Sequence, residues 1–117
     1  MTVPVTPTSD DSRRHIDAAD PLPEERLEAL AMRLRLLGDP TRIRLIQRLN
    51  GSGAASVGAL AAGLPLTRQG VSRQLGLLHQ AGIVRRRREG MCVLYELADW
   101  TGLWLLEQLA DALVAEP

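Results

Sequence analysis

The chain has a single cysteine, Cys92, and no lysine among its 117 residues. One cysteine excludes an internal disulfide, which is consistent with a reducing compartment. All fourteen basic residues are arginine. Arginine suits bidentate contacts with phosphate and guanine, but we ascribe the complete absence of lysine to genome-wide codon bias and give it no functional weight.

Long apolar runs are also missing. No stretch approaches the roughly 18 residues of a membrane-spanning helix, and the N-terminus lacks the apolar core of a signal peptide. We therefore expect no membrane partner and a cytoplasmic location. The sequence shows no nucleophile beside a base, no phosphate-binding glycine loop and no metal centre, so we do not expect an enzyme.

Net charge is absent from the chain as a whole, but charge is unevenly distributed. Residues 31–90 contain eleven arginines and only two acidic residues, whereas residues 91–117 contain five acidic residues and no basic one. A strongly positive segment within a neutral chain permits contacts with the phosphates of a nucleic acid. The central segment is therefore the candidate for binding double-stranded DNA.

Residues 56–80 have the pattern of two short helices joined by a tight turn. Ser56 can cap the first helix, Gly63 stands where a left-handed residue commonly ends a helix, and Pro65 prevents simple continuation. Thr67 can cap the second helix. The apolar face of this second helix, which we expect to pack on the body of the domain, comprises Val71, Leu75 and Leu78. The pattern predicts a helix-turn-helix.

The opposite face of the second helix is polar. Helical spacing places on it Gln69, Ser72, Arg73 and Gly76. Arg68 lies to the side, at the helix N-terminus, where its long reach and the backbone amides suit a phosphate or a base edge. Arginine can pair with guanine, glutamine with adenine, and serine with either. In an isolated helix a merely solvated polar surface would be the favoured explanation of this face, so the interpretation depends on the residues that follow.

A basic hairpin follows the second helix. Its expected first arm is Ile83–Arg88, its turn is Glu89 and Gly90, and its second arm, Met91–Leu97, alternates as a half-buried strand does. Alternate side chains of a strand point to opposite faces, so we expect two of the four consecutive arginines to reach DNA and two to serve other ends. An arginine-rich edge strand can also simply block aggregation. Joined to a helix-turn-helix, however, the hairpin favours nucleic-acid binding.

Several motifs occur in the order typical of one family. They are LLGDPTRIRLIQRL at Leu36–Leu49, an S-x-x-L element in the second helix, an AGIV exit and an REG turn. From about Leu30 to Leu97 the sequence resembles the ArsR/SmtB family of winged-helix repressors. The resemblance implies a mainly α fold with a small β-hairpin wing, in the order α-α-α-α-β-β-α. It also implies a homodimer through the first and last helices that represses transcription from palindromic operators and is released by an effector.

The resemblance further implies which residues contact DNA. The expected set comprises Thr67, Arg68, Gln69, Ser72, Arg73, Arg86, Arg87, Arg88 and Gly90. Gln74 occupies a position where many relatives have histidine, so their base preference is not transferred. Asp39 and Pro40 suit a helix cap and a first helical position; they identify the family without contacting DNA.

Two further helices are expected near the ends of the chain, one over Pro23–Leu37 and one from an Asp99 cap to about Ala115. The apolar arc of the last helix spans roughly 180°, which is wider than one compact core needs. We therefore expect a homodimer interface that includes Leu27, Leu30, Leu34, Leu103, Leu106, Leu109 and Leu113. The alternative is that both helices cover only their own domain. Trp100 and Trp104 lie on the other side of the last helix.

These features predict one winged helix-turn-helix domain for DNA binding and dimerisation, residues 21–117. A polar N-terminal arm, residues 1–20, precedes it and is expected to be flexible on its own. Two other interpretations remain open. One is a winged-helix module that binds proteins instead of DNA, which would be expected to have an apolar second-helix face. The other is a metal-responsive repressor with a non-standard site between subunits.

The metal sites known in the family are missing from this sequence. Such sites need clustered cysteines, or histidines with carboxylates, and the helix that begins at Val57 has no cysteine pair. The remaining scattered candidates are His15, His79, Cys92, Glu107 and Asp111. We therefore expect no cofactor, and a response either to another effector or to a separate sensor protein.

Overall fold

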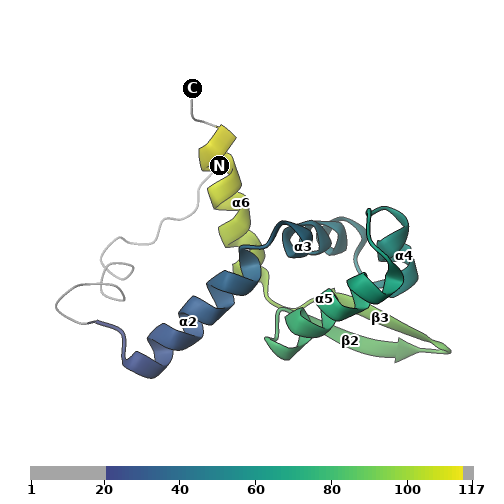
Figure 1. Cartoon of the computed structure of the whole chain (residues 1–117), viewed down its shortest axis with the longest axis horizontal. Helices are drawn as coiled ribbons and strands as arrows, with labels where there is room; N and C mark the ends of the chain where they lie inside the picture. The colour runs from purple at the N-terminus through teal and green to yellow at the C-terminus, as the bar shows by residue number, and fades with distance from the viewer. Residues whose placement is uncertain (1–20, 115–117) are drawn as a thin grey trace. The chain divides into compact units, whose positions relative to one another are not determined.

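The computed structural model describes residues 21–114 of the chain. The chain divides into two units, residues 1–32 and residues 33–117. Helix α2 (Glu24–Leu37) begins in the first unit and ends in the second. The second unit continues with α3 (Pro40–Ser52), β1 (Ala55–Ser56), α4 (Val57–Ala62), α5 (Arg68–Gln80), β2 (Val84–Glu89), β3 (Cys92–Leu97) and α6 (Trp100–Val114), as Figure 1 shows. None of the helices in residues 21–114 has both the length and the apolar character needed to cross a membrane.

Four helix N-termini have the predicted side-chain caps. In each, a side-chain oxygen accepts a hydrogen bond from the backbone N–H three residues later. The distances are 3.2 Å for Asp39, 3.1 Å for Ser56, 2.9 Å for Thr67 and 3.0 Å for Asp99. A cap satisfies one of the unpaired N–H groups of the first turn and contributes about 1 kcal/mol to stability. The local sequence therefore sets where α3, α4, α5 and α6 begin.

Helices α5 and α4 end in different ways, although a glycine follows each of them. At the end of α5, Gly82 has a φ of 78° and the N–H of Ile83 donates to the carbonyl of Leu78 at 2.9 Å, as in a Schellman motif. The predicted left-handed end of α4 at Gly63 is wrong, because Gly63 has a φ of −103°. A Cβ on Gly63 would collide with the guanidinium of Arg48. Glycine at this position therefore leaves room for the guanidinium of Arg48, which a larger residue would displace.

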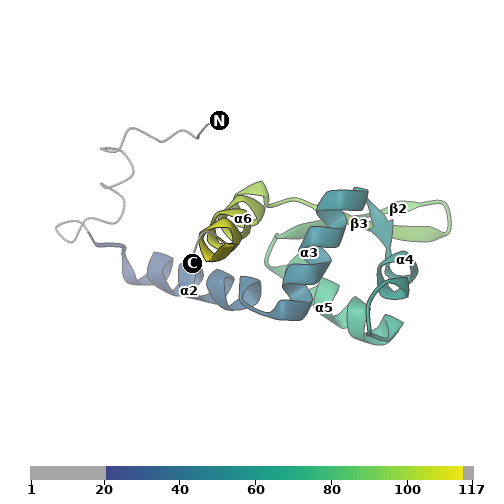
Figure 2. The same cartoon turned by 90° about the horizontal axis from the view of Figure 1, so that it is seen from above.

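The three strands form an antiparallel sheet in the order β1-β3-β2. The predicted order lacked β1, so the described part of the chain reads α-α-β-α-α-β-β-α. Strand β1 was missed because two residues are too few to show any alternation. The hairpin of β2 and β3, hereafter the wing, was predicted to within one residue at each end. Its two-residue loop begins with Gly90 at a φ of 64°, as a tight hairpin requires. Figure 2 shows the wing projecting past α4.

One apolar core holds the second unit together. Its buried side chains are Leu37, Leu45, Ile46, Leu49, Leu60, Val71, Leu75, Leu78, Ile83, Val84, Tyr95, Leu97 and Leu103. Each such side chain contributes roughly 1.5–3 kcal/mol by leaving water. The predicted apolar face of α5 is confirmed, since its three residues are completely buried. This packing turns the polar face of α5 outwards.

Candidate nucleic-acid interface

The outward face of α5 presents the polar side chains that the sequence predicted. Gln69, Ser72 and Arg73 are exposed, and Gly76 is half-buried beside them. We call these four residues the reading face. A Cβ on Gly76 would meet nothing within 4 Å, so the glycine leaves open space over this turn of the helix. Thr67, which caps α5, is exposed as well. The face is therefore polar, solvated and accessible.

Arg68 extends from the start of α5 towards α4. A Cβ on Gly58, in the first turn of α4, would collide with the guanidinium of Arg68. The guanidinium therefore lies directly on glycine backbone. Sequence reasoning placed Arg68 beside the reading face but did not identify Gly58, because nothing in the local pattern connects two residues ten positions apart. A shallow groove of about 500 Å³ adjoins the two helices and is lined by Ser56, Val57, Gly58, Arg68, Gln69, Ser72, Cys92 and Val93.

The wing divides its arginines between two faces. The strand register places Arg86 and Arg88 on the face of the hairpin that contributes the buried Tyr95 to the core. Arg85 and Arg87 lie on the opposite face. Within residues 21–114, neither Arg86 nor Arg88 forms an ion pair. The four arginines thus alternate between two faces as predicted, and the pair on the core side has no carboxylate partner among residues 21–114. Whether that pair contacts DNA stays a prediction.

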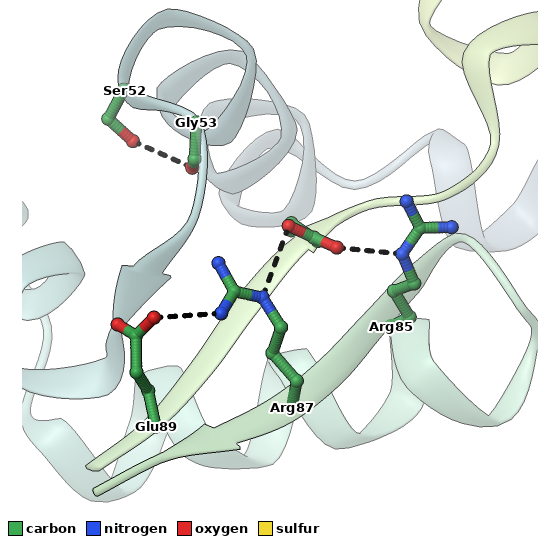
Figure 3. A network of polar contacts seen from close by, with 6 residues as sticks. Ser52, Gly53, Arg85, Arg87 and Glu89 are labelled. Carbon is green, nitrogen blue, oxygen red and sulfur yellow. Dashed lines mark hydrogen bonds and ion pairs between the residues drawn. The ribbon is translucent and has the colours of Figure 1, made fainter.

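The arginines on the outer face are paired with carboxylates (Figure 3). Arg85 Nε donates to Glu96 Oε2 at 2.8 Å, and Arg87 Nη1 donates to Glu89 Oε2 at 3.1 Å. Arg87 Nε also lies 3.7 Å from Glu96 Oε1. The hydrogen bond from Arg85 lowers the pKa of Glu96, and the hydrogen bond to Glu89 raises the pKa of Arg87. The outer face of the wing is therefore close to neutral.

The predicted wing contacts are thus not equivalent in the structure. Arg86 and Arg88 lie on the side of the hairpin on which α5 packs, whereas Arg87 lies on the other side in two ion pairs. Gly90 lies at the tip of the wing and is exposed. Contact of these four residues with DNA stays a prediction, and the geometry favours Arg86 and Arg88 within it.

Gln74 turns away from the reading face. Its Oε1 accepts a hydrogen bond from Arg42 Nη1 at 2.8 Å, and Arg42 Nε donates to the carbonyl of Leu36 at 2.8 Å. Sequence reasoning noted the departure from histidine at this position but missed its partner. Arg42 belongs to the DPTR motif, whose local pattern indicates only a helix start. The pairing depends on how α3 and α5 cross.

The predicted dimer residues fall into two groups. Leu103 belongs to the core of its own unit, and Leu106 packs against that core. In contrast, the exposed fractions of Leu34, Leu109 and Leu113 are 45%, 56% and 76%, and Leu27 and Leu30 are exposed as well. A mainly apolar groove of about 510 Å³ lies between α3 and α6, and its polar lining residues are Gln47, Asn50, Glu107 and Asp111. The dimer interface stays a prediction.

The candidate metal ligands are not brought together. Among residues 21–114, no three histidine, cysteine, aspartate or glutamate side chains form a group that could hold a metal ion. His79 is half-buried in the last turn of α5, and Cys92 is exposed at the start of β3. Glu107 and Asp111 lie on α6. His15 lies outside the described residues, so the non-standard intersubunit metal site stays an untested alternative.

Known proteins match this chain in sequence and in structure. A family model described as a helix-turn-helix domain matches residues 37–87. The biofilm growth-associated repressor of Agrobacterium fabrum is 41% identical over 91 residues, which cover 76% of this chain and 77% of that protein. The HTH-type transcriptional repressor SmtB of Mycobacterium tuberculosis is 39% identical over 79 residues, which cover 68% of this chain and 58% of that protein.

Among solved structures, the antimony-specific transcriptional repressor AntR superposes with a TM-score of 0.72 at 30% sequence identity. The superposition covers 85% of this chain and 88% of that one. All three relatives are named as repressors, two of them as transcriptional repressors.

Proposed function

Since this chain belongs to the ArsR/SmtB family of winged-helix transcriptional regulators, we propose that its reading face and its wing bind operator DNA as one surface. One observation supports this most directly. The groove that contains Gln69 and Ser72 of α5 is continued by Val93 of β3, and Arg88 stands directly opposite Val93 in the hairpin. Polar side chains of α5 and the strand partner of Arg88 therefore line the same depression.

In this proposal α5 enters the major groove. Gln69, Ser72 and Arg73 are spaced at i, i+3 and i+4, so they lie on one side of the helix. Arg73 can bridge guanine O6 and N7, Gln69 can pair with adenine, and Ser72 can contact either base or phosphate. Thr67 and Arg68 flank the N-terminus of α5, whose backbone N–H groups favour a phosphate. Reading and anchoring are thus divided along the helix.

The wing supplies contacts that do not depend on base sequence. In the proposal Arg86 and Arg88 contact the flanking phosphates or the minor groove, and Gly90 brings bare backbone to the tip of the wing. Each phosphate neutralised by an arginine releases counterions and makes the affinity more sensitive to salt. Arg87 contributes less, because it must first leave Glu89 and Glu96.

A symmetric homodimer suits this mode of binding. Two recognition helices about one DNA turn apart, roughly 34 Å, read an inverted repeat. Three exposed leucines of the second unit, Leu34, Leu109 and Leu113, supply an apolar surface that a second copy can cover, and all three also line the groove between α3 and α6. In the same proposal, an effector or a separate sensor protein releases the DNA by changing this dimer.

A gel shift with the DNA upstream of the protein's own gene tests the proposal. We expect one discrete complex that survives an excess of unrelated duplex and weakens steeply as salt rises. Binding that is equal on both duplexes and insensitive to salt would contradict the proposal. It would favour instead a winged-helix module that binds other proteins.

A further inference from the structure

A single arginine side chain joins three helices of the second unit. Arg42, in the first turn of α3, donates from Nε to the carbonyl of Leu36 at 2.8 Å and from Nη2 to the carbonyl of Arg35 at 3.5 Å. From Nη1 it donates to Gln74 Oε1 at 2.8 Å. The C-terminal turn of α2 and the middle of α5 are therefore held by the two sides of one guanidinium.

The chemistry of this joint makes it directional. The last carbonyls of a helix have no partner within the helix and attract a positive charge. A guanidinium is planar and presents its donors in a fixed fork, so the direction to α2 fixes the direction to Gln74. Arg42 is half-buried, and its hydrogen bonds to Leu36 and Gln74 are partly shielded from competing water. Lysine, with one ammonium, cannot hold both partners in this geometry.

A second arginine fastens the far end of α5 to the same turn of α2. Arg33 Nη2 donates to the carbonyl of Ala81 at 2.9 Å, directly after α5. Arg33 Nη1 donates to Asp99 Oδ2 at 2.8 Å, and the other oxygen of Asp99 caps α6. The recognition helix is thus tied to α2 near its middle and at its end. Gln74 follows Arg73 of the reading face directly, so the joint at the middle acts beside the base contacts.

We propose that Arg42, acting through Gln74, is a positioning residue that sets the orientation of the recognition helix relative to α2. The inference rests on the proposed function, in which α5 reads DNA and α2 pairs the subunits. In a symmetric dimer the separation of the two recognition helices depends on how each α5 is held against the paired helices. Loss of the joint should therefore relax the half-site spacing that the dimer accepts, and leave the number of phosphate contacts unchanged.

The test begins with the wild-type protein and a random duplex library, from which the preferred palindrome is selected. Fluorescence anisotropy then measures the affinity for this palindrome and for versions with one or two base pairs inserted at its centre. We expect the insertions to weaken wild-type binding about tenfold or more. In Arg42→Met the loss should shrink to about threefold or less, with the salt slope unchanged, because Arg42 does not contact phosphate.

Variants of the acceptor separate positioning from folding. Gln74→Leu should relax the spacing as Arg42→Met does, whereas Gln74→Glu keeps an acceptor for the guanidinium and should retain wild-type discrimination. Arg44→Gln is the matched control, because Arg44 lies on the same helix as Arg42. Within residues 21–114 the Arg44 side chain forms no hydrogen bond or ion pair. Its spacing discrimination should match the wild type.

Three outcomes would overturn the inference. The first is that both Arg42→Met and Gln74→Leu discriminate against inserted base pairs as the wild type does. The second is a salt slope that falls by about one in Arg42→Met, and the third is that Arg44→Gln tolerates the insertions as well as Arg42→Met does. If Arg42→Met does not fold by circular dichroism, the two Gln74 variants decide the question. Failure of the wild type to select any palindrome would instead contradict the proposed function, so the two failures are distinguishable.

Discussion

Individual residues control how much positive charge the protein offers to DNA. Glu96 lies opposite Arg85 in the hairpin and also approaches Arg87. Without this carboxylate Arg85 would have no acidic partner among residues 21–114, whereas Arg87 would keep its ion pair with Glu89. Because of Glu96, the positive charge of the wing that no carboxylate neutralises lies mainly on Arg86 and Arg88.

Replacing Glu96 with glutamine should release Arg85, while Arg87 stays paired with Glu89. We expect the affinity of Glu96→Gln for any duplex to rise at low salt and its salt slope to steepen by up to about one, for the single arginine released. Titration against an unrelated duplex at several salt concentrations measures both effects. An unchanged slope would show that Arg85 does not reach DNA even when it is unpaired.

The same carboxylate predicts a dependence of stability on pH. The hydrogen bond from Arg85 lowers the pKa of Glu96 in the folded chain below the ordinary value of 4.5. Its stabilising contribution is therefore present above pH 4.5 and is lost as the pH falls through the lowered pKa. The difference in Tm between the wild type and Glu96→Gln should shrink in acid. A difference that stays constant from neutral pH downwards would contradict this assignment.

Substitution of Gly58 should weaken DNA binding without lowering the stability of the fold. An alanine Cβ would displace the guanidinium of Arg68, which is the flexible end of a side chain, so the fold tolerates the change. Helix propensity favours alanine over glycine by up to about 1 kcal/mol. We expect Gly58→Ala to melt no lower than the wild type and to bind the selected operator about three- to tenfold more weakly.

The matched control for this change is Gly51→Ala, also in a helix, where a Cβ would meet nothing within 4 Å. This variant should bind as the wild type does. Unchanged operator affinity in Gly58→Ala would show that the position of Arg68 does not matter for binding.

At the scale of helices and strands, the sequence predicts most features that depend only on neighbouring residues. The caps at Asp39, Ser56, Thr67 and Asp99 and the apolar stripe of α5 each depend on a few neighbouring residues, and all are confirmed. Strand β1 escaped prediction because its two residues become a strand only by pairing with β3. Contacts such as Arg42 with Gln74, or Arg68 with Gly58, depend on how helices cross, which periodicity does not report.

Substitutions on the two faces of the wing should reduce DNA affinity and its salt dependence to different extents. Arg88→Ala should weaken binding to all duplexes to a similar extent and reduce the salt slope by about one, because it removes a phosphate contact. Arg85→Ala removes the same charge from the opposite strand face, where Glu96 already neutralises it, and should change the slope less. Parallel salt titrations compare them. A larger effect of Arg85→Ala would reverse the assigned orientation of the wing.

The whole molecule is expected to function as a dimer. Leu34, Leu109 and Leu113 are exposed although a leucine side chain gains from leaving water, and exposed apolar patches of this kind mark interaction sites. The predicted interface residue Leu103 is already used within its own core. The exposed leucines therefore form the part of the predicted interface that a second copy would bury.

A charge placed on this surface should separate the subunits. We expect light scattering at micromolar concentration to give the wild type twice the 12.8 kDa chain mass, and Leu109→Glu to scatter as a monomer with its fold intact, because Leu109 is 56% exposed. Gln108→Glu adds the same charge at the neighbouring position of α6 and should remain dimeric. A monomeric wild type would contradict the dimer proposal.

The central claim is that α5 reads base sequence, and Arg73 tests it most directly. The decisive measurement is the ratio of affinities for the selected operator and an unrelated duplex at one salt concentration, for the wild type and for Arg73→Ala. Loss of a bidentate base contact should lower this ratio by about ten- to hundredfold, with a much smaller change on the unrelated duplex. An equal loss on both duplexes would show that Arg73 contacts only phosphate and would contradict the account.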